Sequence, residues 1–335
     1  MQKTLKYLSL VMMVCWSMLA LPALAGQPDW VAGESADYPS ANYLTGRGVG
    51  STEDEAKNRA RGDLATIFEV RIQVQTENTT SVARSGKQEQ VNQMATQRVS
   101  ARSDKVISGV SVPLTWRDPV TKDFHALAIL SRAQAAAGLR DEIGRIDDEV
   151  QQQVDKAKAA TDPLLGIAAL AQAQSAFTKR DAFEASLKVV NPSGHGIDPP
   201  IAQSVVQDSL GAALKRVHIA PEVADDGGEA AFAALLKGGV AAAGFLANSK
   251  AEADLLLVGK LALSDLGRQA NWNWVRATVE VSLVERDSGR VRGSKTWPVK
   301  ASAQDAATAK ARALMEVEKL FKRELRTAII GFASN

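Results

Sequence analysis

The spacing of apolar residues in the first third of the chain switches between period two, typical of strands, and a period of three to four, typical of helices. Ala56, Ala60 and Leu64 mark a helical stripe, whereas VRIQVQ at 70–75 alternates as a strand does. This order predicts an α+β sandwich with helices on one face of a mostly antiparallel sheet. The predicted elements are a strand at 43–49, a helix at 52–68, a strand at 70–75, a helix at 89–104 and strands at 107–118 and 123–131.

The segment before the first strand, residues 26–42, is rich in turn formers and predicts a loop, with Trp30 packed onto the first domain. Thr52 and Glu55 have the spacing of a capping box, which predicts the start of the first helix.

Residues 132–190 have helical periodicity, and Pro163 divides them because proline suits the first position of a helix. The apolar seam of the first helix is Leu139, Ile143, Ile146, Val150 and Val154. We expect two antiparallel helices. The alternative is a tetratricopeptide-like pair that binds peptides, although a single pair cannot form a stacked groove. NPSGHGIDPP, at 191–200, has the composition of a linker.

The C-terminal part of the chain predicts a second α+β unit. Its expected elements are a helix at 201–216, a strand at 217–220, a helix at 231–248, strands at 255–263, 272–286 and 291–299, and a helix at 302–330. The predicted organisation is therefore a first α+β domain at 26–131, a helical hairpin at 132–190, a linker at 191–200 and a second α+β domain at 201–335.

The strand predicted at 272–286 is amphipathic. Because successive side chains of a strand point to opposite faces, Trp272, Trp274 and Arg276 share the face opposite to the apolar residues. Two tryptophans on a polar face predict an interaction surface, since tryptophan is enriched at binding hot spots. The alternative is that they cover the end of the sheet, or pack beneath the middle helices or the first domain.

Three glycines, Gly46, Gly48 and Gly50, precede the first helix and raise the question of a dinucleotide-binding loop. The motif G-x-G-x-x-G requires a third glycine where this chain has Ser51 or Glu53. The first turn of the helix also carries three acidic residues, which oppose phosphate binding at a helix N-terminus. We therefore expect no nucleotide, and we expect the glycines to let the helix approach the strand backbone.

The first 25 residues combine Lys3 and Lys6 with an apolar run and the tripeptide Ala-Leu-Ala. This is the pattern of a secretory signal peptide cleaved after Ala25. The alternative is a retained membrane anchor, although the apolar run is shorter than the ~20 residues that a span needs. We expect a periplasmic protein, free or associated with the outer membrane.

The only cysteine, Cys15, lies in that leader, so we expect no disulfide in the mature protein. The residues just before it, Met13 and Val14, are too large for a lipid-attachment site, so we expect no lipid anchor. The whole chain has 40 basic and 38 acidic residues, and the leader removes two lysines. The mature chain is then formally neutral, which disfavours nucleic acid as a partner.

The residue types that carry catalysis are present without the spacing that catalysis needs. No two of His125, His195 and His218 have the spacing of metal ligands, and there is no H-E-x-x-H or G-x-S-x-G motif. We therefore expect no catalytic residue, no metal and no cofactor. An envelope hydrolase that cuts glycan or peptide through an unrecognised carboxylate pair is the alternative, because nothing in the sequence selects or excludes such a pair.

PDW at 28–30, YP at 38–39 and the glycine-rich stretch from Tyr43 resemble the opening of the LPP-twenty lipoprotein family of bacterial envelope proteins. The resemblance covers residues 28–135. It implies an α+β domain at the envelope, often near the outer membrane, without a known catalytic centre. The lipobox cysteine that the family name implies is missing here.

The C-terminal part resembles, more weakly, the N-terminal domain of the translocation protein TolB and related domains of curli-secretion and flagellar-assembly envelope proteins. Together the two resemblances imply an envelope protein as partner, in an outer-membrane, flagellar or secretion assembly. The function predicted from the sequence is a non-catalytic assembly or scaffolding factor.

Overall fold

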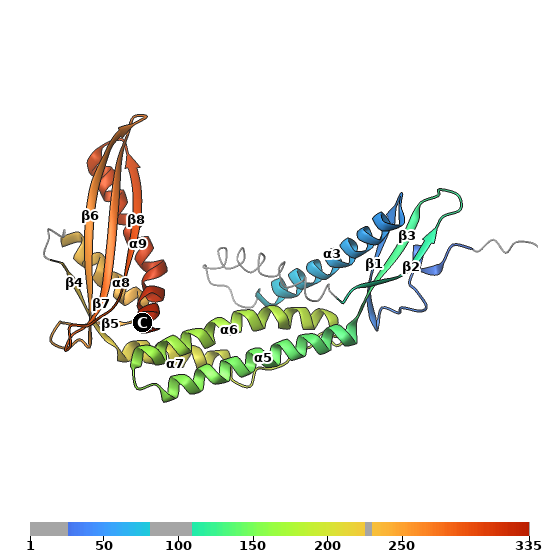
Figure 1. The fold of residues 1–335 in the computed structure, drawn as a ribbon, viewed down its shortest axis with the longest axis horizontal. Coiled ribbons are helices and arrows are strands. Elements are labelled where there is room, and N and C mark those ends of the chain that lie inside the picture. Colours follow the sequence, from blue (N-terminus) through green and yellow to red (C-terminus); the bar gives the residue numbers. More distant parts are fainter. Residues whose placement is uncertain (1–25, 81–108, 225–229, 335) are drawn as a thin grey trace, which may run out of the picture. The chain divides into compact units, whose positions relative to one another are not determined.

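The computed structural model describes residues 26–80, 109–224 and 230–334 (Figure 1). The chain forms two compact units: Met1–Leu139 with Ala185–Gly196, and Arg140–Glu184 with Ile197–Asn335. Each unit has its own sheet, and the predicted α+β class is confirmed. Within the described residues, no helix is long and apolar enough to cross a membrane.

The first unit is built on a three-stranded antiparallel sheet with the order β1-β3-β2. The strands are β1 (Tyr43–Gly50), β2 (Ser111–Arg117) and β3 (Phe124–Ser131), and the long helix α3 (Glu53–Thr80) packs against them. A short helix, α2 (Asp29–Ala32), replaces part of the predicted loop. Its Trp30 is buried against Leu127 and Ile129, so the predicted packing of Trp30 is confirmed.

The strand predicted at 70–75 is wrong, because these residues continue helix α3. The alternation of Val70, Ile72 and Val74 coexists with a second pattern, in which Phe68 and Ile72 extend the apolar stripe by steps of four. Phe68 and Ile72 are buried, whereas Val70 is exposed. The four-residue repeat therefore decides the structure. The helix predicted at 89–104 lies outside the described residues.

Helix α3 begins with a cap that differs in one partner from the predicted capping box. The Glu55 amide donates to Thr52 Oγ1 at 3.2 Å, as expected. The Glu55 carboxylate accepts from the Ser51 amide at 2.9 Å rather than from Thr52. The Glu55 amide is one of those that the helix leaves free at its start, whereas the second bond ties the residue before the cap to the first turn.

The glycines of β1 face this helix at very short range. A Cβ built on Gly50 would lie 2.7 Å from the Ala56 nitrogen, and one on Gly46 would lie 2.6 Å from the Ala60 oxygen. At Gly48 a Cβ would overlap the helix backbone. Only residues without a side chain allow strand and helix to approach in this way.

The middle of the chain forms two long helices, α5 (Arg132–Ala159) and α6 (Pro163–Val190). The Leu164 amide donates to Asp162 Oδ1 at 2.9 Å, which places Pro163 at the first helical position. The seam residues Leu139, Ile143, Ile146 and Val150 are buried, as a packed helix face requires. Both helices contribute residues to both units.

The second unit is built on a five-stranded sheet with the order β5-β4-β6-β7-β8, in which β4 is parallel to β5 and β6 and the other pairs are antiparallel. Helices α8 and α9 pack on one face of this sheet, as Figure 1 shows. The elements are α7 (Gln203–Arg216), β4 (His218–Val223), α8 (Ala230–Ala243), β5 (Leu246–Ala247), β6 (Leu255–Gln269), β7 (Trp272–Glu285), β8 (Val291–Ala303), α9 (Ala306–Gly331) and η1 (Phe332–Ser334).

The helix predicted at 231–248 ends earlier, at Ala243. Gly244 has a φ of 93°, which breaks the helix and turns the chain into the short strand β5. Strands β6 and β8 run further than predicted, to Gln269 and Ala303. Pairing with β7 keeps these ends extended. The helix predicted at 302–330 therefore begins later, at Ala306, after Asp305 caps it.

Candidate functional site

Strand β7 has two faces of opposite character. Val275, Ala277 and Val279 are buried under α8 and α9, whereas Trp272 and Arg276 are exposed. We call the second side the open face; it consists of the β7 residues Trp272, Trp274, Arg276, Thr278, Glu280 and Ser282, with their cross-strand neighbours in β6 and β8. The structure thus places the three residues of the sequence-predicted interaction surface side by side on one strand.

Trp272 lies next to the turn that joins β6 to β7. The turn consists of Ala270 and Asn271, with φ of 50° and 65°, and the pair Gln269–Trp272 closes it. Positive φ at both positions is what a two-residue hairpin turn needs to match the twist of the strands. The Trp272 side chain is 41% exposed and offers apolar surface at this end of the sheet.

A β-bulge lies opposite Trp274. Here Leu266 and Gly267 of β6 together face a single residue of β7. Gly267 has a φ of 79°, which favours glycine, and its amide donates to Asp265 Oδ1 at 2.8 Å. A bulge bends its strand and changes the direction of nearby side chains. Trp274 is half-buried beside it.

The backbone behind the open face is held by side chains from the far side of the sheet. Asn273 Nδ2 donates to the Gln304 oxygen at 2.6 Å, and an Arg312 guanidinium nitrogen donates to the Ser302 oxygen at 2.8 Å. Val275 is buried directly beside Trp274 in the chain. The backbone that carries the tryptophans is therefore held in place, which reduces the conformational entropy lost on binding.

Arg276 has two direct cross-strand neighbours, Ser264 on β6 and Lys300 on β8. All three side chains are exposed. Lys300 is a residue of the open face that sequence reasoning missed, because its position depends on the exact register of β7 and β8. That register shifts by one residue between Leu283 and Val284.

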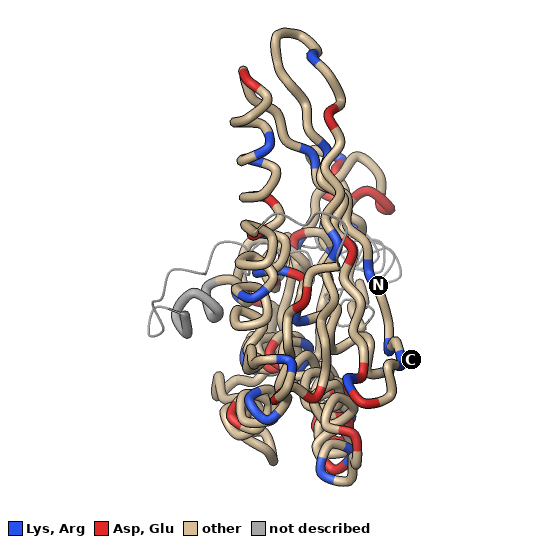
Figure 2. Tube along the Cα trace, turned by 90° about the vertical axis from the view of Figure 1, so that its left-hand side faces the viewer, with Lys and Arg blue, Asp and Glu red and all other residues tan. Residues whose placement is uncertain are grey.

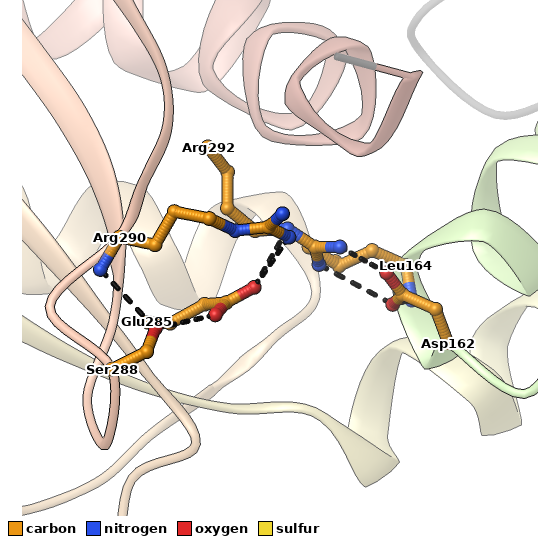
Figure 3. Close-up of polar contacts among 6 residues, drawn as sticks. All are labelled: Asp162, Leu164, Glu285, Ser288, Arg290 and Arg292. Carbon is orange, nitrogen blue, oxygen red and sulfur yellow. Dashed lines mark hydrogen bonds and ion pairs between the residues drawn. The ribbon is translucent and has the colours of Figure 1, made fainter.

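A polar cluster joins the turn between α5 and α6 to the β7–β8 hairpin (Figure 3). Arg292 binds both carboxylate oxygens of Asp162, and its Nε lies 3.4 Å from Glu285 Oε1 in an ion pair. Glu285 also accepts from Ser288 Oγ at 2.6 Å and from Arg290 at 2.8 Å. The cluster ties two segments of the second unit that are far apart in sequence.

The charges of this cluster stabilise one another. The hydrogen bond from Arg292 holds the pKa of Asp162 below its ordinary value, and the bond from Ser288, followed by that from Arg290, lowers the pKa of Glu285. The Asp162 bond in turn raises the pKa of Arg292. A carboxyl group that acts as a general acid needs a raised pKa. These groups have the character of ionised structural partners.

A buried arginine connects the two middle helices within the second unit. Arg180 on α6 is 1% exposed, and its guanidinium donates to Asp147 Oδ1 at 2.7 Å and to Glu184 Oε2 at 2.6 Å. It also donates to the Ile197 oxygen at 2.8 Å. A buried charge is tolerated only when it is paired and hydrogen-bonded in this manner.

The histidines lie on separate elements. His125 on β3 packs beside Trp116, with ring centroids 5.3 Å apart. His218 opens β4 with Nδ1 3.9 Å from an Asp254 oxygen, and His195 lies between α6 and α7. In residues 26–80, 109–224 and 230–334, no group of three His, Cys, Asp or Glu side chains has an arrangement that holds a metal.

Comparison with known proteins gives one family and several solved structures. Residues 28–131 match the model of the LPP20 lipoprotein family. No curated protein matches the chain. A secreted protein from Helicobacter pylori is 12% identical over 86% of this chain and 97% of its own, with a TM-score of 0.43. A minor lipoprotein from Acinetobacter baumannii is 13% identical over 33% of this chain and 91% of its own, with a TM-score of 0.28.

The predicted resemblance to the LPP-twenty family rested on PDW, YP and the glycine-rich strand. The family model covers these residues, so the prediction is confirmed, whereas the TolB-like resemblance of the C-terminal part stays a prediction. Residues 28–131 of this chain, which hold the three-stranded sheet and α3, are those that match the LPP20 lipoprotein family.

Proposed function

We propose that this chain is an exported, non-catalytic protein of the cell envelope that binds another envelope protein. It acts in assembly or scaffolding at the outer-membrane side of the periplasm, after cleavage at Ala25. The partner belongs to an outer-membrane, flagellar or secretion assembly. The observation that carries the proposal is the open face, where Trp272, Trp274 and Arg276 lie together on one strand.

The composition of the open face supports a protein partner. Tryptophan and arginine are the residue types that most often dominate the binding energy of protein interfaces. The face is one side of a sheet, and the strand that carries it is held by buried residues such as Val275, Ala277 and Val279. Packed surfaces with aromatic anchors are typical of protein interfaces, whereas small substrates are bound in concave pockets.

The match to the LPP20 lipoprotein family supports the location. It concerns the first unit, whereas the open face belongs to the second. Figure 2 shows Lys and Arg interspersed with Asp and Glu along the described chain, in keeping with the neutral charge of the mature sequence. A chain in which both signs of charge are interspersed favours a specific protein contact over bulk electrostatic binding.

The state of the carboxyl groups supports a non-catalytic role over the hydrolase alternative. Hydrogen bonds from Arg323 and then Trp297 lower the pKa of Glu324, as Arg292 lowers that of Asp162. A glycosidase pair needs one carboxyl group with a raised pKa close to an ionised one. The lowered values fit counter-ions of basic side chains.

The proposal is tested by chemical crosslinking of the mature protein in envelope fractions, followed by mass spectrometry. The test variant is Trp272→Ser/Trp274→Ser, and the control is Met315→Ser, which removes an exposed apolar side chain from α9. We expect wild type and control to capture the same partner and the double variant to lose it. Capture of that partner by all three proteins contradicts the proposal.

A further inference from the structure

Two cations face each other on the open face without an acidic partner. Arg276 and Lys300 are direct cross-strand neighbours in the β7–β8 ladder, and both side chains are exposed. Within the described part of the chain neither forms an ion pair or a side-chain hydrogen bond. Like charges directly opposite each other destabilise a sheet. The pair therefore lowers the stability of the isolated protein.

The acids at this end of the sheet are already engaged. Asp265 Oδ1 accepts from the amide of Gly267 at 2.8 Å. Asp305 caps α9, where its carboxylate accepts from the Thr308 amide and hydroxyl, both at 2.8 Å. Both acids keep their charge, but among the described residues neither forms an ion pair with Arg276 or Lys300, so the two cations beside Trp274 have no carboxylate bound to them.

Docking through the open edge of the sheet is disfavoured. β8 is the edge strand next to β7, and an added strand would need its free amides. Pro298 has no amide, and Lys300 projects a charge from the same strand. Proline and lysine are the residues by which edge strands resist the addition of another strand. This leaves the side chains of the open face as the surface on which a partner can dock.

We infer that the occupant of the open face is an acidic segment of a partner protein. Its carboxylates bind Arg276 and Lys300, and an adjacent apolar side chain packs on Trp272 and Trp274. Arginine is suited to this role because its guanidinium binds a carboxylate through two parallel hydrogen bonds. The inference rests on the proposed function and adds the chemistry of the partner to it.

The test is selection of random 12-residue displayed peptides on the mature protein and on Arg276→Glu/Lys300→Glu. The control is Lys215→Glu/Lys237→Glu, which reverses the same number of exposed charges on α7 and α8. We expect peptides with Asp and Glu beside an apolar residue on wild type and control, and basic peptides on the charge-reversed variant. A peptide selected on wild type should bind that variant about tenfold more weakly or worse.

Two results overturn the inference. One is enrichment of the same peptides on wild type and on the charge-reversed variant. The other is binding to vesicles of phosphatidylglycerol and phosphatidylcholine, lost on charge reversal, without selection of acidic peptides; it assigns the face to an anionic lipid surface.

Trp272→Ser/Trp274→Ser separates this inference from the proposed function. If it loses the selected peptides while charge reversal changes nothing, the face binds proteins but not acidic ones. If neither variant changes peptide binding, the proposed function fails as well. Circular dichroism melts identify any variant that has failed to fold, and Arg276→Gln/Lys300→Gln then replaces the charge-reversed protein.

Discussion

Gly48 on β1 and Ala56 on α3 are packed so closely that a Cβ at position 48 would overlap the Ala56 carbonyl oxygen. The obstacle is helix backbone, which cannot rotate away as a side chain does. We expect Gly48→Ala to lower the free energy of unfolding by about 1–3 kcal/mol, the usual effect of overpacking. Thermal melts followed by circular dichroism measure the change.

Gly62 provides the matched control for this prediction. It lies within α3 and is exposed, and a Cβ there would have no atom within 4 Å. Because glycine disfavours a helix interior, Gly62→Ala should raise stability by about 0.5–1 kcal/mol. If both variants shift the melting temperature in the same direction, the close approach of strand and helix is not what requires glycine at position 48.

Arg180→Met should destabilise the second unit strongly. The substitution leaves Asp147 and Glu184 without the buried guanidinium that neutralises them. Removing one partner of a buried ion pair costs roughly 3–5 kcal/mol. The neighbouring Lys179→Met should change the free energy of unfolding by less than about 0.5 kcal/mol, because Lys179 is exposed and its Nζ lies 3.8 Å from Glu149. Equal effects of the two substitutions in urea denaturation would contradict this.

Asp162→Asn should weaken the tie between the α5–α6 turn and the β7–β8 hairpin by roughly 1–3 kcal/mol at neutral pH. Arg292 lowers the pKa of Asp162 in the folded state. The carboxylate therefore stabilises the fold above its unfolded pKa of about 3.9, and that contribution is lost as the pH falls through the lower, folded value.

Urea denaturation across this pH range measures the effect. The difference in stability between wild type and Asp162→Asn should shrink as the medium becomes acid. Asp155→Asn is the control for an exposed carboxylate: Asp155 lies on α5 and, among the described residues, is hydrogen-bonded only to nearby Gln151 and Lys158. The Gln151 bond also lowers the pKa of Asp155, so the acid effect of Asp162→Asn is the part that exceeds the effect of this control. A difference that stays constant down to the lowest pH means that the ion pair contributes nothing.

Most elements of the fold were predictable because their apolar periodicity is unambiguous. The buried stripe of α9 and the alternation of β7 are examples, and both elements lie close to where the sequence placed them. Residues 70–75 show where this fails. Their alternation and the four-residue step from Phe68 to Ile72 are both present in the sequence, and the packing of α3 on the sheet selects the second.

The open face was predictable in part. Trp272, Trp274 and Arg276 follow from period two along a single strand. The position of Lys300 cannot be predicted in this way. If β7 and β8 were paired without a bulge from Val284–Val291 onward, Val299 would lie opposite Arg276. The bulge inserts Arg292 into β8, where it binds Asp162. Asp162 is distant in sequence, so the residues of the hairpin alone do not predict the bulge.

The two tryptophans of the open face should be dispensable for folding. Trp272→Ser/Trp274→Ser should lower stability by about 1–2 kcal/mol, because Trp272 is exposed and Trp274 is half-buried. Trp297→Ser should cost about 3–5 kcal/mol, since Trp297 is buried and its Nε1 donates to Glu324 at 2.7 Å. Melting temperatures of the two proteins distinguish an exposed surface from a core. A larger loss in the double variant than in Trp297→Ser would place the open-face tryptophans in the core.

The central claim, that a partner protein sits on the open face, is tested most directly by photocrosslinking in living cells. A benzophenone amino acid replaces either Gln269, the cross-strand neighbour of Trp272, or Met315. Met315 is an exposed residue of α9, the helix that packs on the opposite side of the sheet. We predict a discrete crosslinked protein at position 269 that disappears in Trp274→Ser, and none at position 315. The same crosslinked protein at both positions, or one at position 315 alone, would contradict the account.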